Sequence, residues 1–193
     1  MVASLLRAAD HRRMPWKNGG GETTEIAVFP PDAGLSDFDW RVSMAKVAGD
    51  GPFSIFPGID RTLSILEGNG MELSIAGQGA VRLDAASEPL PFPADAAVDA
   101  RLTDGPITDL NVMTRRGGFT HSVRRMHIDH QTALTATGTP ALLFCHRGTI
   151  EVDGDDLSAQ LTPLDCLVLD EAAEKTLRLS GTGTFFLIEI RRG

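Results

Sequence analysis

The sequence contains no hydrophobic run long enough to span a membrane or to direct secretion. A spanning helix needs about 20 consecutive apolar residues, and the 193 residues hold no such run. The start of the chain has one apolar stretch, from Val2 to Leu6, which Ser4 interrupts. This stretch is too short for the hydrophobic region of a signal peptide, and no cleavage site follows it. We therefore expect a cytoplasmic protein with no membrane partner.

Cysteine and lysine are also scarce, and the net charge is negative. Cys145 and Cys166 are the two cysteines, and they form no CxxC motif, which favours reduced core residues over a disulfide or a metal site. The 26 acidic residues outnumber the 18 basic ones, and the net charge of −8 argues against a nucleic-acid partner. Only Lys17, Lys46 and Lys175 are lysines. The many arginines suit the recognition of carboxylates, although a genomic bias toward arginine codons also explains them.

Short segments rich in alternating or β-branched residues recur about every ten residues, with glycine-rich turns between them. Amphipathic helices are not evident. Many short strands at even spacing are typical of an all-β sandwich or barrel with few short helical turns. The expected strands are Thr23–Phe29, Asp39–Val47, Arg61–Leu66, Met71–Ile75, Ala80–Leu83, Ile107–Thr114, Ala141–Arg147, Thr149–Val152, Cys166–Leu169, Thr176–Leu179 and Thr184–Arg191.

Two segments of the first half recur in the same order in the second half. Residues 63–69 (LSILEGN) match residues 143–149 (LFCHRGT), and residues 101–116 match residues 177–192. Glycines align with glycines in both matches. Two matches in one order indicate a duplicated β unit.

The order of strands and glycine turns in each half resembles that of cupins. We therefore expect a bicupin, that is, two cupin-like jelly-roll barrels packed together. The expected domains are residues 1–116 and 117–193, joined near Gly117–Gln131, with N-terminal strands to about Val47 that cross between them.

Cupin metal sites use three histidines and a glutamate, because a divalent metal needs several converging imidazoles and carboxylates. The five histidines here are His11, His121, His127, His130 and His146. His127 and His130 are the close pair, but no glutamate follows them nearby. We therefore expect surface histidines at these two positions, and no bound metal or cofactor.

The segment MPWKNGGGETTEI, residues 14–26, is the most distinctive part of the chain. Three consecutive glycines let a backbone approach a ligand closely, and their amides can meet an anion. The segment is not a phosphate-binding P-loop, because GxxxxGK[ST] is absent. A flexible loop that leads into the first strand is the alternative interpretation.

Arg41, Ser43 and Ala45 share one face of the expected strand Asp39–Val47. An inward arginine beside small residues leaves room for a ligand in a small barrel and supplies a fork for its carboxylate. The alternative is a solvent-facing Arg41 paired with Glu25 or Asp39.

Two further residues lie at positions suited to a pocket. Arg61 follows the Pro57-Gly58 turn at the start of a strand, where it can reach the mouth of a barrel. On the strand Ile107–Thr114, Asp109, Asn111 and Met113 share a face, and Asn111 can orient a polar ligand. A solvent-facing Asn111 is the alternative.

Three motifs resemble those of the HutD/Ves family of bacterial proteins: PWKNGGGETTEI, WRVSMAKV followed by GPFSIFPGIDR, and DLNVMTRR. The similarity covers nearly the whole chain. It implies a bicupin fold and an association with bacterial histidine utilisation, in which a HutD-like protein binds a pathway metabolite and moderates flux, whereas Ves-like members lie outside that pathway. The pocket candidates that it implies are Trp16, Lys17, Asn18, Gly19, Glu25, Arg41, Ser43, Arg61 and Asn111.

Three functions follow as hypotheses. The first is metal-independent binding of a small anionic metabolite of the formylglutamate, formiminoglutamate or urocanate type in the first barrel, with a regulatory role in histidine utilisation. The second is a metal-independent hydrolase or isomerase, in which Glu25 is the base and Arg41 or Lys17 stabilises an oxyanion. The third is a scaffold with a vestigial pocket. No GxSxG motif is present, and a homodimer through an edge strand is compatible with the sequence.

Overall fold

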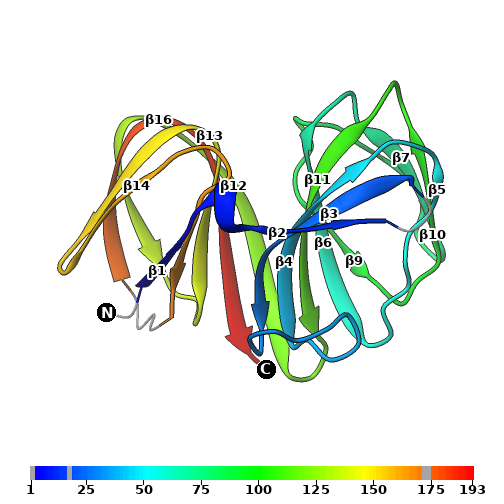
Figure 1. Ribbon diagram of the computed structural model, residues 1–193, viewed down its shortest axis with the longest axis horizontal. Coiled ribbons are helices and arrows are strands. Elements are labelled where there is room, and N and C mark those ends of the chain that lie inside the picture. Colours follow the sequence, from blue (N-terminus) through cyan, green and yellow to red (C-terminus); the bar gives the residue numbers. More distant parts are fainter. Residues whose placement is uncertain (1–2, 17–18, 171–174) are drawn as a thin grey trace. The chain divides into compact units, whose positions relative to one another are not determined.

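The chain folds into two compact units, each built almost entirely of β-strands (Figure 1). The computed structural model describes residues 3–16, 19–170 and 175–193. Unit 1 consists of residues 1–11 and 120–193, and unit 2 of residues 12–119. Within the described residues the helical part is one 3₁₀ turn, η1 (Ala8–Asp10), and no helix has the length and apolar character needed to cross a membrane.

Unit 2 contains two sheets. In the first, the strand order is β2-β3-β4-β11-β6-β9, and in the second it is β5-β10-β7-β8. The strands are β2 (Arg12–Pro15), β3 (Gly21–Phe29), β4 (Trp40–Val47), β5 (Gly51–Pro52), β6 (Ile59–Glu67), β7 (Met71–Ile75), β8 (Gly79–Leu83), β9 (Leu90–Pro93), β10 (Val98–Leu102) and β11 (Ile107–Arg115). All registered pairs are antiparallel.

The two sheets of unit 2 share one apolar core. Leu63 and Ile65 of β6 pack with Leu73 of β7 and Val98 of β10, and all four are buried. Along β7, buried apolar residues alternate with exposed polar ones, as expected for a strand with one face on a core. Ala45, Val47 and Ala100 belong to this core and also line a pocket. Polar side chains from β4, β6 and β11 line the same pocket, which is described below.

Unit 1 contains one sheet, in the order β1-β15-β13-β16-β12, with β14 paired to β13. Its strands are β1 (Ala3–Leu6), β12 (Phe119–Ala136), β13 (Ala141–Gly154), β14 (Leu157–Leu161), β15 (Cys166–Leu169) and β16 (Lys175–Arg192). The first strand of the chain thus pairs with β15, near the end of the sequence (Figure 1). Cys145 and Cys166 are both buried and unbridged.

The sequence repeat has a structural counterpart in strand pairing. Between β6 and β11, Glu67 pairs with Thr108 and Ile65 with Asp109, so Leu66 is left as a bulge. Between β13 and β16, Arg147 pairs with Thr184 and Cys145 with Phe185, so His146 is left as the bulge. All of these residues are equivalent in the sequence alignment of the two halves.

The glycine that follows each bulge makes the same close approach. Gly68 has a φ of +92°, and a Cβ there would lie 2.5 Å from the carbonyl oxygen of Pro106. Gly148 has a φ of +83°, and its Cβ would lie 2.0 Å from the carbonyl oxygen of the equivalent Thr182. Glycine recurs at both positions because no side chain fits there.

The predicted all-β class is confirmed, and the finer expectation of two cupin-like barrels stays a prediction. Several segments differ from the sequence expectation. The expected strands Thr176–Leu179 and Thr184–Arg191 are one strand, β16, and β1, β2, β5, β9, β10 and β14 were not expected.

Most of the junction expected near Gly117–Gln131 lies within β12, an 18-residue strand, and Gly117-Gly118, the expected flexible join, lies in the turn before it. The two expected strands between Ala141 and Val152 are one strand, because the pairing of β13 with β16 continues on both sides of the bulge at His146.

Candidate functional site

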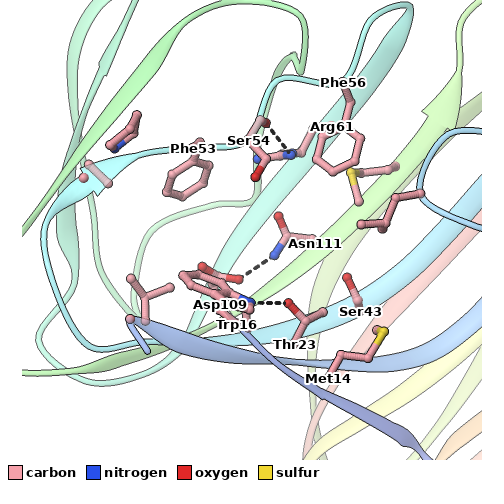
Figure 2. Close-up of a pocket in the computed structure, with 18 of the residues that line it drawn as sticks. Met14, Trp16, Thr23, Ser43, Phe53, Ser54, Phe56, Arg61, Asp109 and Asn111 are labelled. Carbon is pink, nitrogen blue, oxygen red and sulfur yellow. Dashed lines mark hydrogen bonds between the residues drawn. The ribbon is translucent and has the colours of Figure 1, made fainter. Parts of the chain in front are cut away.

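Unit 2 contains a pocket of about 770 Å³ (Figure 2). It is lined by side chains from both sheets, from the loop between β3 and β4, and from the segment between β5 and β6. Its lining residues are Met14, Pro15, Trp16, Gly20, Thr23, Leu35, Arg41, Ser43, Ala45, Val47, Gly49, Asp50, Gly51, Pro52, Phe53, Ser54, Phe56, Arg61, Ala100, Asp109, Asn111 and Met113. A volume of this size accommodates a small organic molecule.

Neighbouring strands place the polar lining side chains in rows across the sheet. Met113 of β11 lies opposite Arg41 of β4 on one side and Arg61 of β6 on the other. Asn111 is likewise paired with Ser43. Because side chains two residues apart on a strand share a face, all five residues point to the same side of the sheet. The register of β4, β11 and β6 therefore brings two arginines to the floor of one pocket.

Arg41 is buried, with a side chain that is 4% exposed. Its Nε donates a hydrogen bond to Glu25 Oε2 at 2.7 Å, and its Nη1 donates to Ser43 Oγ at 3.2 Å. Its Nη2 is buried and has no hydrogen-bond partner in the described part of the chain. Each of the two interpretations of Arg41 is partly right: the side chain lines the pocket, and it is also paired with Glu25. One guanidinium nitrogen is thus left without an acceptor among the described residues.

Arg61 lies among three aromatic rings. Its guanidinium carbon is 5.4 Å from the ring centre of Phe53, 5.3 Å from that of Phe56 and 5.7 Å from that of Phe92. Its Nη2 donates to the carbonyl oxygen of Ser54 at 3.4 Å (Figure 2), whereas its Nε is buried and unpartnered among the described residues. Burial lowers the pKa of Arg61 to about 10, so the guanidinium stays charged at neutral pH. The rings hold a cation that has no ion pair of its own in the described residues.

Asp109 is a buried carboxyl group in the same pocket, 1% exposed. It accepts a hydrogen bond from the amide nitrogen of Asn111, which lies between Asp109 and Arg61 in Figure 2. Burial raises the pKa of Asp109 to about 7, although the charge of Arg61 and the bond from Asn111 both oppose the rise. Near neutral pH this carboxyl is therefore divided between its protonated and ionised forms.

Trp16 forms one wall of the pocket and is held by the following strand. Its indole Nε1 donates to Thr23 Oγ1 at 2.8 Å (Figure 2). A Cβ at Gly21 would lie 3.0 Å from the indole ring and 2.2 Å from the carbonyl oxygen of Lys46. Gly21 is thus required because the indole and β4 both pass close to its backbone. Leu35, on the loop between β3 and β4, is 58% exposed and also lines the pocket.

The structure brings five of the predicted site residues together in this lining: Trp16, Arg41, Ser43, Arg61 and Asn111. Glu25 does not line the pocket but bonds to Arg41. Gly19 is exposed and is not part of the lining, to which the neighbouring Gly20 belongs. Lys17 and Asn18 lie outside the described residues.

Sequence reasoning missed Asp109, Phe53 and Phe56 as site residues. Asp109 shares a face with Asn111, so strand alternation alone could have included it. The two phenylalanines lie in GPFSIFPG, three residues apart and just before Arg61. No periodic pattern there marks them as ring partners of a cation.

Unit 1 has apolar residues at the positions that correspond to the polar floor of the pocket. By the alignment of the two halves, Ala141 stands for Arg61, Phe185 for Asp109 and Leu187 for Asn111. All three are fully buried within the apolar core of unit 1. The polar floor is therefore a property of unit 2.

His127 and His130 both lie on β12, and the Nδ1 atom of His127 is 3.0 Å from Thr184 Oγ1. No group of three or more histidine, cysteine, aspartate or glutamate side chains in residues 3–16, 19–170 and 175–193 could hold a metal ion.

Fold and site together define an all-β protein with an arginine-lined pocket between the sheets of one of its two units. The HutD family model matches residues 8–187, so the chain belongs to the HutD family, which confirms the resemblance found in its motifs. The names of its relatives link this family to the hut genes of histidine utilisation.

Three relatives illustrate the similarity. An uncharacterized 21.2 kDa protein in the hutC 3' region of Pseudomonas putida is 36% identical over 192 residues, which cover 96% of each chain. Protein Ves of Citrobacter koseri is 43% identical over 120 residues, which cover 60% of this chain and 61% of the relative. The solved structure of HutD from Pseudomonas fluorescens SBW25 in a formate condition is 32% identical, covers 100% of both chains and has a TM-score of 0.85.

Proposed function

We propose that unit 2 binds a small acidic metabolite, without a metal, between Arg41 and Arg61. The observation that carries this proposal is the pair of buried guanidinium nitrogens, Arg41 Nη2 and Arg61 Nε, that have no hydrogen-bond partner in the described residues. A buried donor without a partner is costly, and a carboxylate supplies the acceptor that both lack. The ligand site is then the interior of a cupin-like barrel, as the sequence resemblance implies.

The charges of the pocket favour a negatively charged ligand. Glu25 neutralises Arg41, but Arg61 has no ion pair within 4 Å in the described residues and is stabilised by aromatic rings instead. A ligand carboxylate would be the counter-ion of the buried Arg61. Trp16 and Phe53 add flat apolar walls, which suit a ligand with a planar or short hydrocarbon body.

The family link suggests which acids to consider. The hut association supports an acid of the formylglutamate, formiminoglutamate or urocanate type as the ligand. The proposed role is regulatory, in histidine utilisation in the cytoplasm. Each of these molecules has at least one carboxylate and a nitrogen-containing group. Asn111 and Ser43 line the pocket with side chains that can hydrogen-bond to such a group.

An acid–base enzyme is the second candidate, and Asp109 is the observation that favours it. A general acid or base works best when its pKa lies near the working pH, and the pKa of Asp109 is raised to about 7 by burial. Glu25 is a weaker candidate for the base, because its carboxylate accepts a bond from Arg41 and does not line the pocket. Turnover of a bound acid, followed by NMR and abolished in Asp109→Asn with binding retained, would favour this reaction.

A thermal-shift panel of the three acids tests the proposal. We expect one of them to raise the melting temperature of the wild type in metal-free buffer. The affinity for that acid should fall tenfold or more in Arg61→Met, because a charge-assisted hydrogen bond is worth about 1.5–3 kcal/mol. Methionine keeps an apolar chain among the three rings, so unit 2 should still fold.

Arg82→Met is the matched control, since Arg82 is exposed on β8 of the same unit and does not line the pocket. It should bind the acid as the wild type does. Equal affinities in the wild type and in Arg61→Met, or no binding of any of the three acids by the wild type, would contradict the proposal.

A further inference from the structure

Asp109 is a buried carboxyl group with no cation at ion-pair distance in the described residues, although two buried arginines line the same pocket. Its hydrogen bonds come from the Asn111 amide and from the backbone N–H of Ala45. In the view of Figure 2, Asn111 lies between Asp109 and Arg61. Asp109 and Arg61 therefore interact through their charges without direct contact, and each changes the ionisation of the other.

Few other charged groups face this pair. On β4, Arg41 also lines the pocket, and its charge acts on Arg61, but the carboxylate of Glu25 on β3 accompanies it. At the β5 end, Asp50 lines the pocket and accepts a hydrogen bond from the backbone N–H of Leu102 at 2.7 Å. In the buried floor the Arg41–Glu25 pair is neutral. The two remaining charges in the floor are those of Arg61 and Asp109.

The net charge of Arg61 and Asp109 determines how much negative charge a bound ligand can carry. When Asp109 is ionised, the buried floor is neutral, and a second carboxylate near Arg61 would leave one unmatched negative charge. When Asp109 is protonated, Arg61 is unmatched and one negative charge completes the floor. Two carboxylates that share one cation in a buried site do not both stay ionised, because each raises the pKa of the other.

We propose that the pocket binds a single negative charge together with one proton, which the Asp109 carboxyl takes up as the ligand carboxylate reaches Arg61. This inference rests on the proposed function and narrows it, because it favours acids with one net negative charge over those with two. The proton comes from solvent and is bound by the Asp109 oxygen that Asn111 does not contact. The protonated carboxyl then donates a hydrogen bond toward the ligand.

The inference predicts a specific pH dependence of binding. At low pH, Asp109 of the empty pocket already carries its proton, and the affinity for a monoanion is constant. Above a pH of about 7 the proton has to be taken up on binding, so the affinity falls by up to tenfold for each further pH unit. A dianion gains less from the pocket at every pH.

Isothermal titration calorimetry with trans-urocanate tests the inference. At pH 7.5 and above its imidazole ring is uncharged, so the probe is a monoanion. Titrations in two cationic buffers of different ionisation enthalpy, Tris and triethanolamine, give the number of protons taken up. We expect uptake approaching one proton at pH 8 and an affinity about tenfold weaker at pH 8.5 than at pH 7.

Asp109→Asn is the matched variant, since its amide cannot titrate. It should bind trans-urocanate with no proton uptake and with the same affinity at pH 7 and 8.5. N-formylglutamate, which carries two carboxylates, should bind the wild type at least tenfold more weakly than trans-urocanate at pH 8. If the variant does not fold, ¹³C NMR of the aspartate carboxyls in the wild type, with and without trans-urocanate, reports the same proton.

Binding by the wild type without proton uptake would overturn the inference and leave the proposed anion site standing. An unchanged pH dependence in Asp109→Asn, or equal affinity for N-formylglutamate and trans-urocanate, would also overturn it. Failure of the wild type to bind any of the three acids would instead refute the proposed function, and this inference with it.

Discussion

Replacing Asp109 by asparagine should remove a large pH dependence from the stability of unit 2. The substitution keeps the size of the side chain and an acceptor oxygen for Asn111, and it removes the titrating proton. In the folded chain burial raises the pKa of Asp109 from 3.8 to about 7. A raised pKa means that the folded state binds the proton more tightly than the unfolded state.

The sign and the size of the effect follow from this difference. The folded state is favoured while Asp109 is protonated, so its contribution is fully present below pH 4 and is lost as the pH rises toward 7. A rise from 3.8 to about 7 corresponds to about 4 kcal/mol over the whole window. Between pH 5 and pH 7.5 the wild type should lose about 2 kcal/mol relative to Asp109→Asn.

Urea unfolding followed by tryptophan fluorescence measures this difference. Trp16 and Trp40 are the two tryptophans of the sequence, and both belong to unit 2, so the signal reports that unit. Titrating groups elsewhere affect both proteins alike and cancel in the difference between them. A difference in unfolding free energy that stays constant from pH 5 to pH 7.5 would refute the buried, protonated Asp109.

Three further changes test other parts of the structure. Gly77→Ala should cost about 1 kcal/mol of unfolding free energy, and Gly68→Ala should destabilise unit 2 at least twice as much. Both glycines have a positive φ, but a Cβ at Gly77 meets nothing within 4 Å, whereas one at Gly68 meets the backbone of Pro106. Equal urea midpoints for the two variants would contradict the close approach at Gly68. Glu25→Ala should cost about 3 kcal/mol in the same assay, because it leaves Arg41 charged and buried, whereas a loss below about 0.5 kcal/mol would show that the pair is dispensable. Burial alone would raise the pKa of Asp165, but its hydrogen bonds lower that pKa below 3.8, so its stabilisation of unit 1 should be lost as the pH falls below about 4. Amide hydrogen exchange should show this loss of stability in the wild type and a smaller loss in Asp165→Asn. The same acid profile in both proteins would argue against the hydrogen bonds of Asp165 as its cause.

Two strands with a clear apolar pattern were predictable to the residue. Met71–Ile75 alternates buried and exposed side chains, and Cys166–Leu169 is a continuous apolar run, and both segments were expected with the bounds that the structure gives. The strand Phe119–Ala136 was not, because it lies at a sheet edge and pairs only with β16. Its side chains are mostly half-buried or exposed, so they show neither alternation nor an apolar run.

The polar floor of the pocket was partly predictable for the same reason. Strand alternation placed Arg41 and Ser43 on one face and Asn111 on another strand, but only the register of β4, β11 and β6 shows that these faces coincide. The burial of Asp109 depends on that register too. The ring contacts of Phe53 with Arg61 depend on a segment outside the main strands, whose path no sequence pattern specifies.

A crystal structure of the wild type with trans-urocanate, grown in buffer free of other carboxylates, is the most direct test of the proposed site. The site described above predicts the ligand carboxylate within hydrogen-bond distance of Arg41 Nη2 and Arg61 Nε, with its ring against the apolar wall of Trp16 and Phe53. A ligand bound elsewhere on the chain, with both guanidinium nitrogens still unpartnered, would contradict it.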